Sequence, residues 1–211
     1  MSTYQTEEEQ VEAIKKWWKD NGKSVIGGIV LGFVIIGGWQ GWQGYQRNQG
    51  EAASAYFDAM RQAVRSGQQA KAIEDGKRLI GEYGGTAYAS FAALELARLS
   101  YLGGEKAAAR EHLQWVTESA PDPAIREVAR LRLARLLLDI NDVSSLQALL
   151  GEPALPAFVG EFAVVRGDLA RQQGDHEAAR LAYQEALANG VGDQELLRMK
   201  LVDVGGQPSA S

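Results

Sequence analysis

The chain has 211 residues, with 22 lysines and arginines against 27 aspartates and glutamates, and it contains no cysteine. This composition is typical of a globular protein, and the lack of cysteine excludes disulfides, cysteine-ligated metal sites and thiol nucleophiles. The formal net charge of −5 argues against a dedicated nucleic-acid-binding protein.

The first predicted element is an uncharged, apolar segment near the N-terminus, residues 24–46. Its first 19 residues, 24–42, would cover about 28 Å as a helix, close to the thickness of the hydrocarbon core of a bilayer, about 30 Å. Amphipathic rings prefer the headgroup level, and they mark both ends. These are Trp17, Trp18, Trp39, Trp42 and Tyr45. We expect a transmembrane helix rather than the buried helix of a soluble core.

The orientation of this segment follows from the basic residues that flank it. Lys15, Lys16, Lys19 and Lys23 precede it, whereas only Arg47 follows closely. Lysine and arginine near a span are retained on the cytoplasmic side. The sequence therefore predicts a cytoplasmic segment over residues 1–23 and a translocated domain over residues 47–204, which in a bacterium lies in the periplasm.

A cleaved signal peptide is the alternative interpretation of the same segment. Ala53, Ser54 and Ala55 resemble a small-residue cleavage site. However, the N-terminal region is long and the apolar stretch exceeds the usual length of about 7–15 residues. The candidate site also lies beyond Arg47 and Glu51, too far from the apolar end. We therefore expect a permanent anchor.

Glycines recur within the apolar segment as two pairs with a spacing of four. Small residues four apart let another helix approach closely. The two pairs face different directions, since nine residues make about two and a half helical turns. They predict a contact with a partner span or a second copy, although glycine is also common in membrane helices generally. The glycines are Gly28, Gly32, Gly37 and Gly41.

After residue 46 the sequence has the periodicity of amphipathic helices, interrupted by turn signals at Gly67, Gly104, Asn141 and Gly174. The spacings of these markers are 37, 37 and 33 residues, which indicates stacked helix–turn–helix units. Residues around the markers also align in columns. Seven before stand Met60, Ala97, Ala134 and Gly167, five after stand Ala72, Ala109, Leu146 and Ala179, and nine after stand Gly76, Leu113, Leu150 and Tyr183. The columns resemble the tetratricopeptide pattern, and we expect three to four repeats.

The expected fold class is therefore all-α, with an N-terminal transmembrane helix followed by a tetratricopeptide-like helical-repeat solenoid. Asp193 is placed to cap a final helix at the open end of the stack. The leucines expected to cover that end are Leu196, Leu197 and Leu201. Residues 205–211 are expected to form a flexible tail.

Motifs for catalysis and for cofactor or metal binding are not found in the sequence. Gly22, Lys23 and Ser24 resemble the end of a phosphate-binding loop, but Trp17 occupies the position where that motif needs its first glycine. His112 falls on a different repeat from His176, the other histidine, and neither has a ligand cluster nearby. We expect a non-enzymatic protein without a cofactor.

Two columns on the first helices of the repeats predict a partner-binding groove. The column ten residues before the markers holds Phe57, Leu94, Leu131 and Val164, and the column four residues later holds Arg61, Arg98, Arg135 and Asp168. An apolar ladder beside three arginines could bind an extended peptide or a helix through its carboxylates or carbonyls. Alternatively, the arginines pair with neighbouring acids and the apolar column belongs to the core.

Taken together, the sequence resembles the YfgM family, the ancillary subunit of the bacterial SecYEG translocon. The most specific stretches are EEEQVEAIKKWWKDNGKS, the glycine-rich span and WQGWQGYQ, and the resemblance continues through YFDAMRQAV, AKAIEDGKRLI and TAYASFAALELA. The resemblance implies a single-pass protein of the bacterial inner membrane, with a cytoplasmic N-terminus and a periplasmic repeat domain.

The resemblance also implies partners, which the periodicity does not predict. They are the SecYEG translocon, the membrane-anchored periplasmic chaperone PpiD and, through a handover role, emerging polypeptides and other periplasmic chaperones. The cytoplasmic segment is linked in the family to an envelope-stress response regulator. Two other classes stay open: a scaffold for cell-wall or division machinery, and a structural homo-oligomer assembled through the glycine-rich span.

Overall fold

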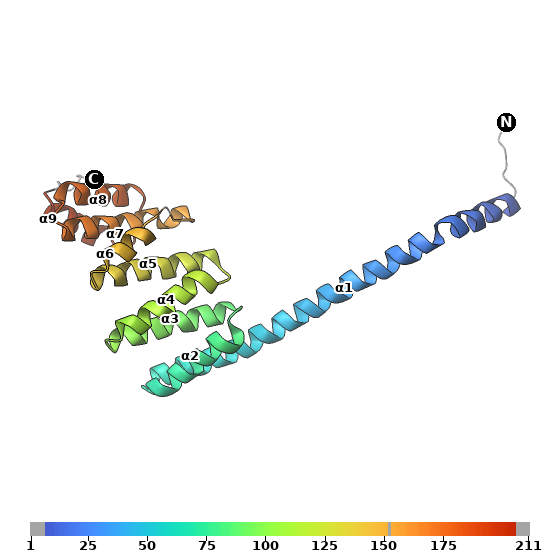
Figure 1. The fold of residues 1–211 in the computed structure, drawn as a ribbon, viewed down its shortest axis with the longest axis horizontal. Coiled ribbons are helices and arrows are strands. Elements are labelled where there is room, and N and C mark those ends of the chain that lie inside the picture. The colour runs from blue at the N-terminus through green and yellow to red at the C-terminus, as the bar shows by residue number, and fades with distance from the viewer. Residues whose placement is uncertain (1–6, 152, 206–211) are drawn as a thin grey trace. The chain divides into compact units, whose positions relative to one another are not determined.

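The computed structural model describes residues 7–151 and 153–205, and within these ranges it is helical, without strands. This confirms the all-α class. Figure 1 shows the helices in chain order. Their bounds are α1 Glu7–Arg65, α2 Gln69–Tyr83, α3 Ala87–Leu102, α4 Lys106–Ser119, α5 Pro123–Asp139, α6 Val143–Leu149, the 3₁₀ helix η1 Pro156–Phe158, α7 Val159–Gln172, α8 His176–Ala188 and α9 Gln194–Asp203.

The chain divides between Gln49 and Gly50 into two compact units. The N-terminal unit holds the apolar part of α1, whose large side chains, such as Phe33 and Ile36, are exposed. This helix is long and apolar enough to cross a membrane, and none of its apolar window is buried. Such a surface is unfavourable in water and suits a lipid environment, so it fits a membrane anchor better than a core helix. The boundaries at residues 24 and 46 stay a prediction.

The second unit consists of four helix pairs followed by a final helix. The first pair joins the end of α1, from Gly50 onwards, to α2, and α3–α4, α5–α6 and α7–α8 follow, with α9 last. Each helix from α2 onwards packs on the next one in the chain up to α6, and α7 packs on both α5 and α8 (Figure 1). The structure therefore contains the predicted tetratricopeptide-like stack, with four pairs.

The turn within each pair places one residue in the left-handed region of backbone space. These residues are the four predicted markers, with φ of 72° at Gly67, 80° at Gly104, 56° at Asn141 and 79° at Gly174. A left-handed residue ends a helix and lets the chain reverse, and glycine adopts it most easily, with asparagine the best-tolerated alternative. The repeat period inferred from the sequence is thus confirmed in the backbone.

Large and small residues face each other where the helices of a pair meet. In the first pair Met60 fills the space above Gly76, since a Cβ on that glycine would lie 2.9 Å from the methionine Cε. The fourth pair reverses the arrangement, because a Cβ on Gly167 would overlap the fully buried ring of Tyr183. The large and the small residue have thus exchanged positions between the two pairs, and both arrangements allow close helix packing.

The third pair is shortened, because α6 has only seven residues. Side chains of α5 hold the loop that follows it. The Arg130 guanidinium donates to the carbonyls of Leu149 and Gly151, each at 2.7 Å, and the buried Glu127 carboxylate accepts from Ala154 N at 3.1 Å. These bonds satisfy backbone groups that a longer helix would have paired internally, so α7 can pack directly on α5.

The final helix α9 begins as expected, because the Asp193 side chain accepts a hydrogen bond from Leu196 N at 2.9 Å. Leu197 and Leu201 are buried against the fourth pair. The prediction for Leu196 is wrong, since its side chain is 45% exposed. A step of one residue turns about 100° around a helix, which points Leu196 away from the face that Leu197 and Leu201 share. Gly205 ends the described chain in a turn, and the remainder of the predicted tail lies outside the described residues.

Candidate partner-binding surface

The first helices of the four pairs carry both predicted columns. We use the name first-helix face for the surface that they form: α1 from Gly50 onwards, α3, α5 and α7. Two of the solvent-open hollows on it together hold five of the predicted groove residues. The smaller, between α1 and α3, is lined by Phe57, Arg61, Val64, Arg65, Phe91 and Glu95. The larger, which we call the α3–α5 cleft, has a volume of about 320 Å³.

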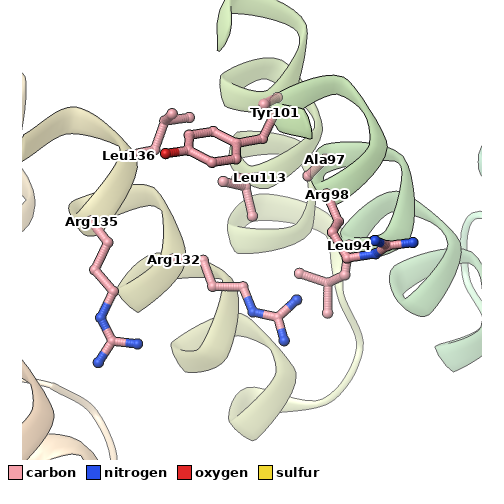
Figure 2. A pocket seen from close by; sticks show the side chains of 9 residues that line it. Leu94, Ala97, Arg98, Tyr101, Leu113, Arg132, Arg135 and Leu136 are labelled. Carbon is pink, nitrogen blue, oxygen red and sulfur yellow. The ribbon is translucent and has the colours of Figure 1, made fainter. Parts of the chain in front are cut away.

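The α3–α5 cleft has an apolar floor and a basic rim (Figure 2). Its nine lining residues are Leu94, Ala97, Arg98 and Tyr101 of α3, Ala109 and Leu113 of α4, and Arg132, Arg135 and Leu136 of α5. Both α3 and α5 pack on α4, which lies behind the cleft. The small side chains of Ala97 and Ala109 leave room in front of α4.

Tyr101 closes one end of the cleft. Its ring extends from α3 towards Leu136 (Figure 2), and its hydroxyl donates to the Asp139 carboxylate of α5 at 3.3 Å. Lys106 Nζ lies 2.8 Å from the same carboxylate. The hydrogen bond and the charge of Lys106 lower the pKa of Asp139, and the carboxylate in turn raises the pKa of Lys106. The negative charge of Asp139 at this end of the cleft is therefore already balanced by Lys106.

The three arginines on the rim differ in their partners. Arg98 donates to Glu95 on its own helix at 2.6 and 2.9 Å, and Arg135 pairs with Glu161 of α7. Arg132 is exposed and makes no hydrogen bond or ion pair with any residue that the structure describes. About half of the Arg98 and Arg135 side-chain surfaces is exposed, and pairs so exposed to water contribute only about 0–1 kcal/mol. All three guanidinium groups could thus bind a partner.

The structure distributes the eight predicted groove residues over three places. Leu94, Arg98 and Arg135 line the α3–α5 cleft, whereas Phe57 and Arg61 line the smaller hollow. Phe57 also contacts Tyr88 and Phe91, with ring centroids 5.8 and 6.0 Å away. The other members lie in neither hollow: Leu131 is buried in the main core, and Val164 and Asp168 belong to the fourth pair. Their role in binding stays a prediction.

Asp168 is paired rather than free at the end of its column. Its carboxylate accepts from Lys200 Nζ at 2.6 and 2.7 Å and from the Tyr183 hydroxyl at 2.8 Å. Burial raises the pKa of Tyr183, and the neighbouring Asp168 carboxylate raises it further to a smaller extent. Lys200 belongs to α9, which follows no repeat register, so the column alone could not reveal this partner. We call these three residues the cap lock.

Sequence reasoning missed several residues of the cleft, although a signal for them was present. Arg132 lies three residues before Arg135 and Tyr101 three residues after Arg98. Residues three apart share a helix face, so both could have been added to the column. Leu113 was recognised only as a packing residue. Its second role as part of the floor depends on how far apart α3 and α5 lie.

The glycine pairs of the apolar helix leave open backbone surface. A Cβ on Gly28, Gly32, Gly37 or Gly41 would meet no described atom within 4 Å outside its own helix. Close contact with another helix at these glycines stays a prediction.

Within the described part of the chain, no three His, Asp or Glu side chains gather as they would around a metal ion.

Burial lowers the pKa of His112, with the charge of Lys77 acting in the same direction and that of Glu111 opposing it.

Comparisons with known proteins agree with this architecture. Residues 15–206 match the family model described as Tetratricopeptide repeat-like domain. A protein of Haemophilus influenzae named Ancillary SecYEG translocon subunit is 30% identical over 196 residues, which is 92% of this chain and 96% of the relative. Proteins of the same name from Escherichia coli and Neisseria gonorrhoeae are 28% and 26% identical, each covering 95% of this chain and 98% of the relative. No solved structure matches. With its apolar N-terminal helix and four-pair repeat unit, the chain belongs to the YfgM family of ancillary SecYEG translocon subunits.

Proposed function

We propose that this protein is a non-enzymatic, membrane-anchored scaffold of the Sec translocon that helps pass translocated proteins to periplasmic chaperones. The names of its relatives support the association with SecYEG. The observation that carries the partner-binding part is the α3–α5 cleft, because its apolar floor and three arginines can make both apolar and charged contacts with a polypeptide segment. PpiD, other periplasmic chaperones and emerging polypeptides are the proposed partners, and the cytoplasmic segment has a regulatory role.

The proposed orientation places residues 1–23 in the cytoplasm and residues 47–204 in the periplasm of a bacterium. The chain has no cysteine, so a single introduced thiol reports its own side of the membrane. Ser66→Cys, in the exposed turn after α1, should react with a membrane-impermeant maleimide in spheroplasts. Glu12→Cys, on the exposed surface near the N-terminus, should react only after lysis. The opposite pattern would overturn the orientation.

The partners are tested by purifying the tagged full-length protein in mild detergent and identifying co-purifying proteins by mass spectrometry. We expect SecYEG subunits together with PpiD or another periplasmic chaperone. Recovery of cell-wall enzymes instead would favour a scaffold for wall or division machinery. Recovery of the protein alone, as a detergent-stable oligomer, would favour a structural homo-oligomer.

The same purification tests the proposed contact through the glycine-rich span. Gly28→Leu with Gly32→Leu, or Gly37→Leu with Gly41→Leu, should reduce recovery of SecYEG, because leucine prevents close approach of a partner helix. Gly27→Leu with Gly38→Leu is the matched control, since these glycines lie outside both pairs. Equal recovery from all three double variants would exclude a specific contact at the paired glycines.

A further inference from the structure

We propose that the α3–α5 cleft binds one apolar side chain of an extended acidic segment, whose flanking carboxylates are held by Arg98, Arg132 and Arg135. This inference rests on the proposed partner-binding role of the first-helix face and adds the chemistry of the segment that it selects.

The floor of the cleft determines the central side chain of that segment. The side chains of Leu94, Leu113 and Leu136 make the floor apolar, and none of the nine lining residues is acidic. A volume of about 320 Å³ lies at the lower end of the range of ligand pockets, about 300–1,000 Å³. An α-helix, about 10–12 Å across, could rest on such a cleft but not enter it. One aliphatic or aromatic side chain of an extended chain fits the space and the chemistry.

The rim determines the charge of the segment. Arg98 projects from α3, and Arg132 and Arg135 project from α5 (Figure 2). The guanidinium groups of Arg98 and Arg135 turn outwards to their paired acids, so they would swing towards the cleft when a segment binds. The acids that pair with Arg98 and Arg135, Glu95 and Glu161, are not part of the lining. They offset the charges of Arg98 and Arg135 in the unbound protein, so Arg132 supplies the unpaired positive charge of the rim among the described residues, although the whole protein carries a net charge of −5. This local charge favours carboxylates and disfavours lysine and arginine in the bound segment.

Arg132 is the arginine most available to a partner. It has no hydrogen-bonding or ionic partner among the described residues, whereas Arg98 and Arg135 would exchange an existing exposed pair for the new one. Planar guanidinium groups bind carboxylates through two parallel hydrogen bonds.

The backbone geometry of the segment fixes the spacing of its side chains. In an extended chain, residues two apart point to the same side and lie about 6.6 Å from each other. An apolar residue that enters the cleft thus has its neighbours on the same face two positions before and two positions after it. The preferred pattern is acid, any residue, apolar residue, any residue, acid. Segments of this kind would be held, and basic segments would be rejected.

The test uses full-length protein in nanodiscs of zwitterionic lipid and fluorescein-labelled peptides read by fluorescence anisotropy. The probe is Gly-Ser-Asp-Ser-Leu-Ser-Asp-Ser-Gly. One comparison peptide carries Lys for both Asp residues, and the other carries Ser for Leu. We expect the probe to bind about tenfold or more tightly than either comparison peptide, because one comparison peptide loses the charge-assisted hydrogen bonds and the other loses the buried side chain.

Variants of the protein locate the binding. Arg132→Glu and the milder Arg132→Gln should weaken probe binding, by about tenfold or more for the charge reversal. Arg198→Glu is the matched control, because Arg198 is exposed on α9, outside the cleft, and the charge change is the same. It should leave affinity unchanged. Circular dichroism and Tm of each variant test whether folding is intact, and we expect no change because Arg132 is exposed.

Equal affinity for the three peptides, no saturable binding of the probe, or an Arg132→Glu variant that binds as well as Arg198→Glu would overturn this inference. The outcome is separable from that of the proposed function. Failure of the wild-type protein to recover SecYEG subunits in the purification refutes the proposed function, whatever the peptides show. Recovery of SecYEG without peptide binding refutes only the chemistry proposed for the cleft.

Discussion

Arg98, Arg135 and Asp168 occupy the same repeat position, six residues before the turn marker of their helix pair, yet their surroundings differ. The two arginines are about half exposed beside the α3–α5 cleft. Asp168 is only 17% exposed and is held by Lys200 and Tyr183 in the cap lock. Position within the repeat thus determines which face a side chain joins, and the next element in the chain determines whether that face stays open.

The same contrast extends to the packing beneath these residues. In the fourth pair Gly167 leaves room for the Tyr183 ring, and the ring brings its hydroxyl to Asp168. In the second and third pairs Ala97 and Ala134 occupy the position of Gly167, and Leu113 and Leu150 occupy that of Tyr183, with no polar group to offer. The fourth pair is therefore built to receive α9, while the second and third place mostly buried apolar side chains at the base of the solvent-open α3–α5 cleft.

The most damaging change to the fourth pair should be Gly167→Ala. The added Cβ would overlap the Tyr183 ring, which is fully buried and cannot turn away. Overpacking of this kind costs about 1–3 kcal/mol, and we expect the upper half of that range in urea unfolding. Gly81→Ala in α2 is the control, because no atom lies within 4 Å of the added Cβ, and it should be neutral or slightly stabilising. Equal effects of the two substitutions would refute the packing argument.

Removing the cation of the cap lock should have the next largest effect. Lys200→Met keeps the length of the side chain but removes the cation paired with the mostly buried Asp168 carboxylate, which keeps its hydrogen bond from the Tyr183 hydroxyl. We expect a loss of about 1–2 kcal/mol and a lower Tm. Arg198→Met on the same helix should change stability by less than about 0.5 kcal/mol. A Lys200→Met variant as stable as this control would show that the fourth pair is not held closed by charge.

Mild acidification should destabilise the repeat unit by a smaller amount through His112 in the second pair. Burial lowers its pKa in the folded protein below the ordinary value of about 6.5, which the unfolded chain retains. The unfolded state therefore binds the proton more readily, and stability falls as pH decreases through about 6.5. Tm measured from pH 7.5 to 5.5 should decline in the wild type and decline less in His112→Gln. Parallel declines would exclude His112 as the cause.

The smallest change in stability is expected for Arg98→Glu combined with Arg135→Glu. Both side chains are exposed, so the free energy of unfolding should shift by no more than about 1 kcal/mol. Recovery of a chaperone or polypeptide partner should nevertheless fall sharply, because the cleft loses its positive rim. Undiminished recovery would show that the open face of the second and third pairs is not the binding surface.

Features that depend on local backbone chemistry could be predicted from the sequence. The four turn markers were found as regularly spaced breaks rich in glycine and asparagine, which the left-handed region favours, and the start of α9 was found because Asp193 caps it. Features that depend on tertiary distance could not. The pairing of Asp168 with Lys200 joins residues 32 positions apart in an element outside the repeat. The exposure of Leu196 depends on the rotation of α9 against the fourth pair.

Site-specific photocrosslinking in cells most directly tests whether partners bind the first-helix face. A photoreactive phenylalanine derivative would replace Tyr101, at the end of the α3–α5 cleft, or Leu181, which is similarly exposed but lies on α8, a second helix. We predict adducts with a translocating polypeptide or a translocon-associated chaperone from position 101 and few from position 181. Equal yields at both positions, or adducts predominantly from position 181, would contradict the assignment of partner binding to this face.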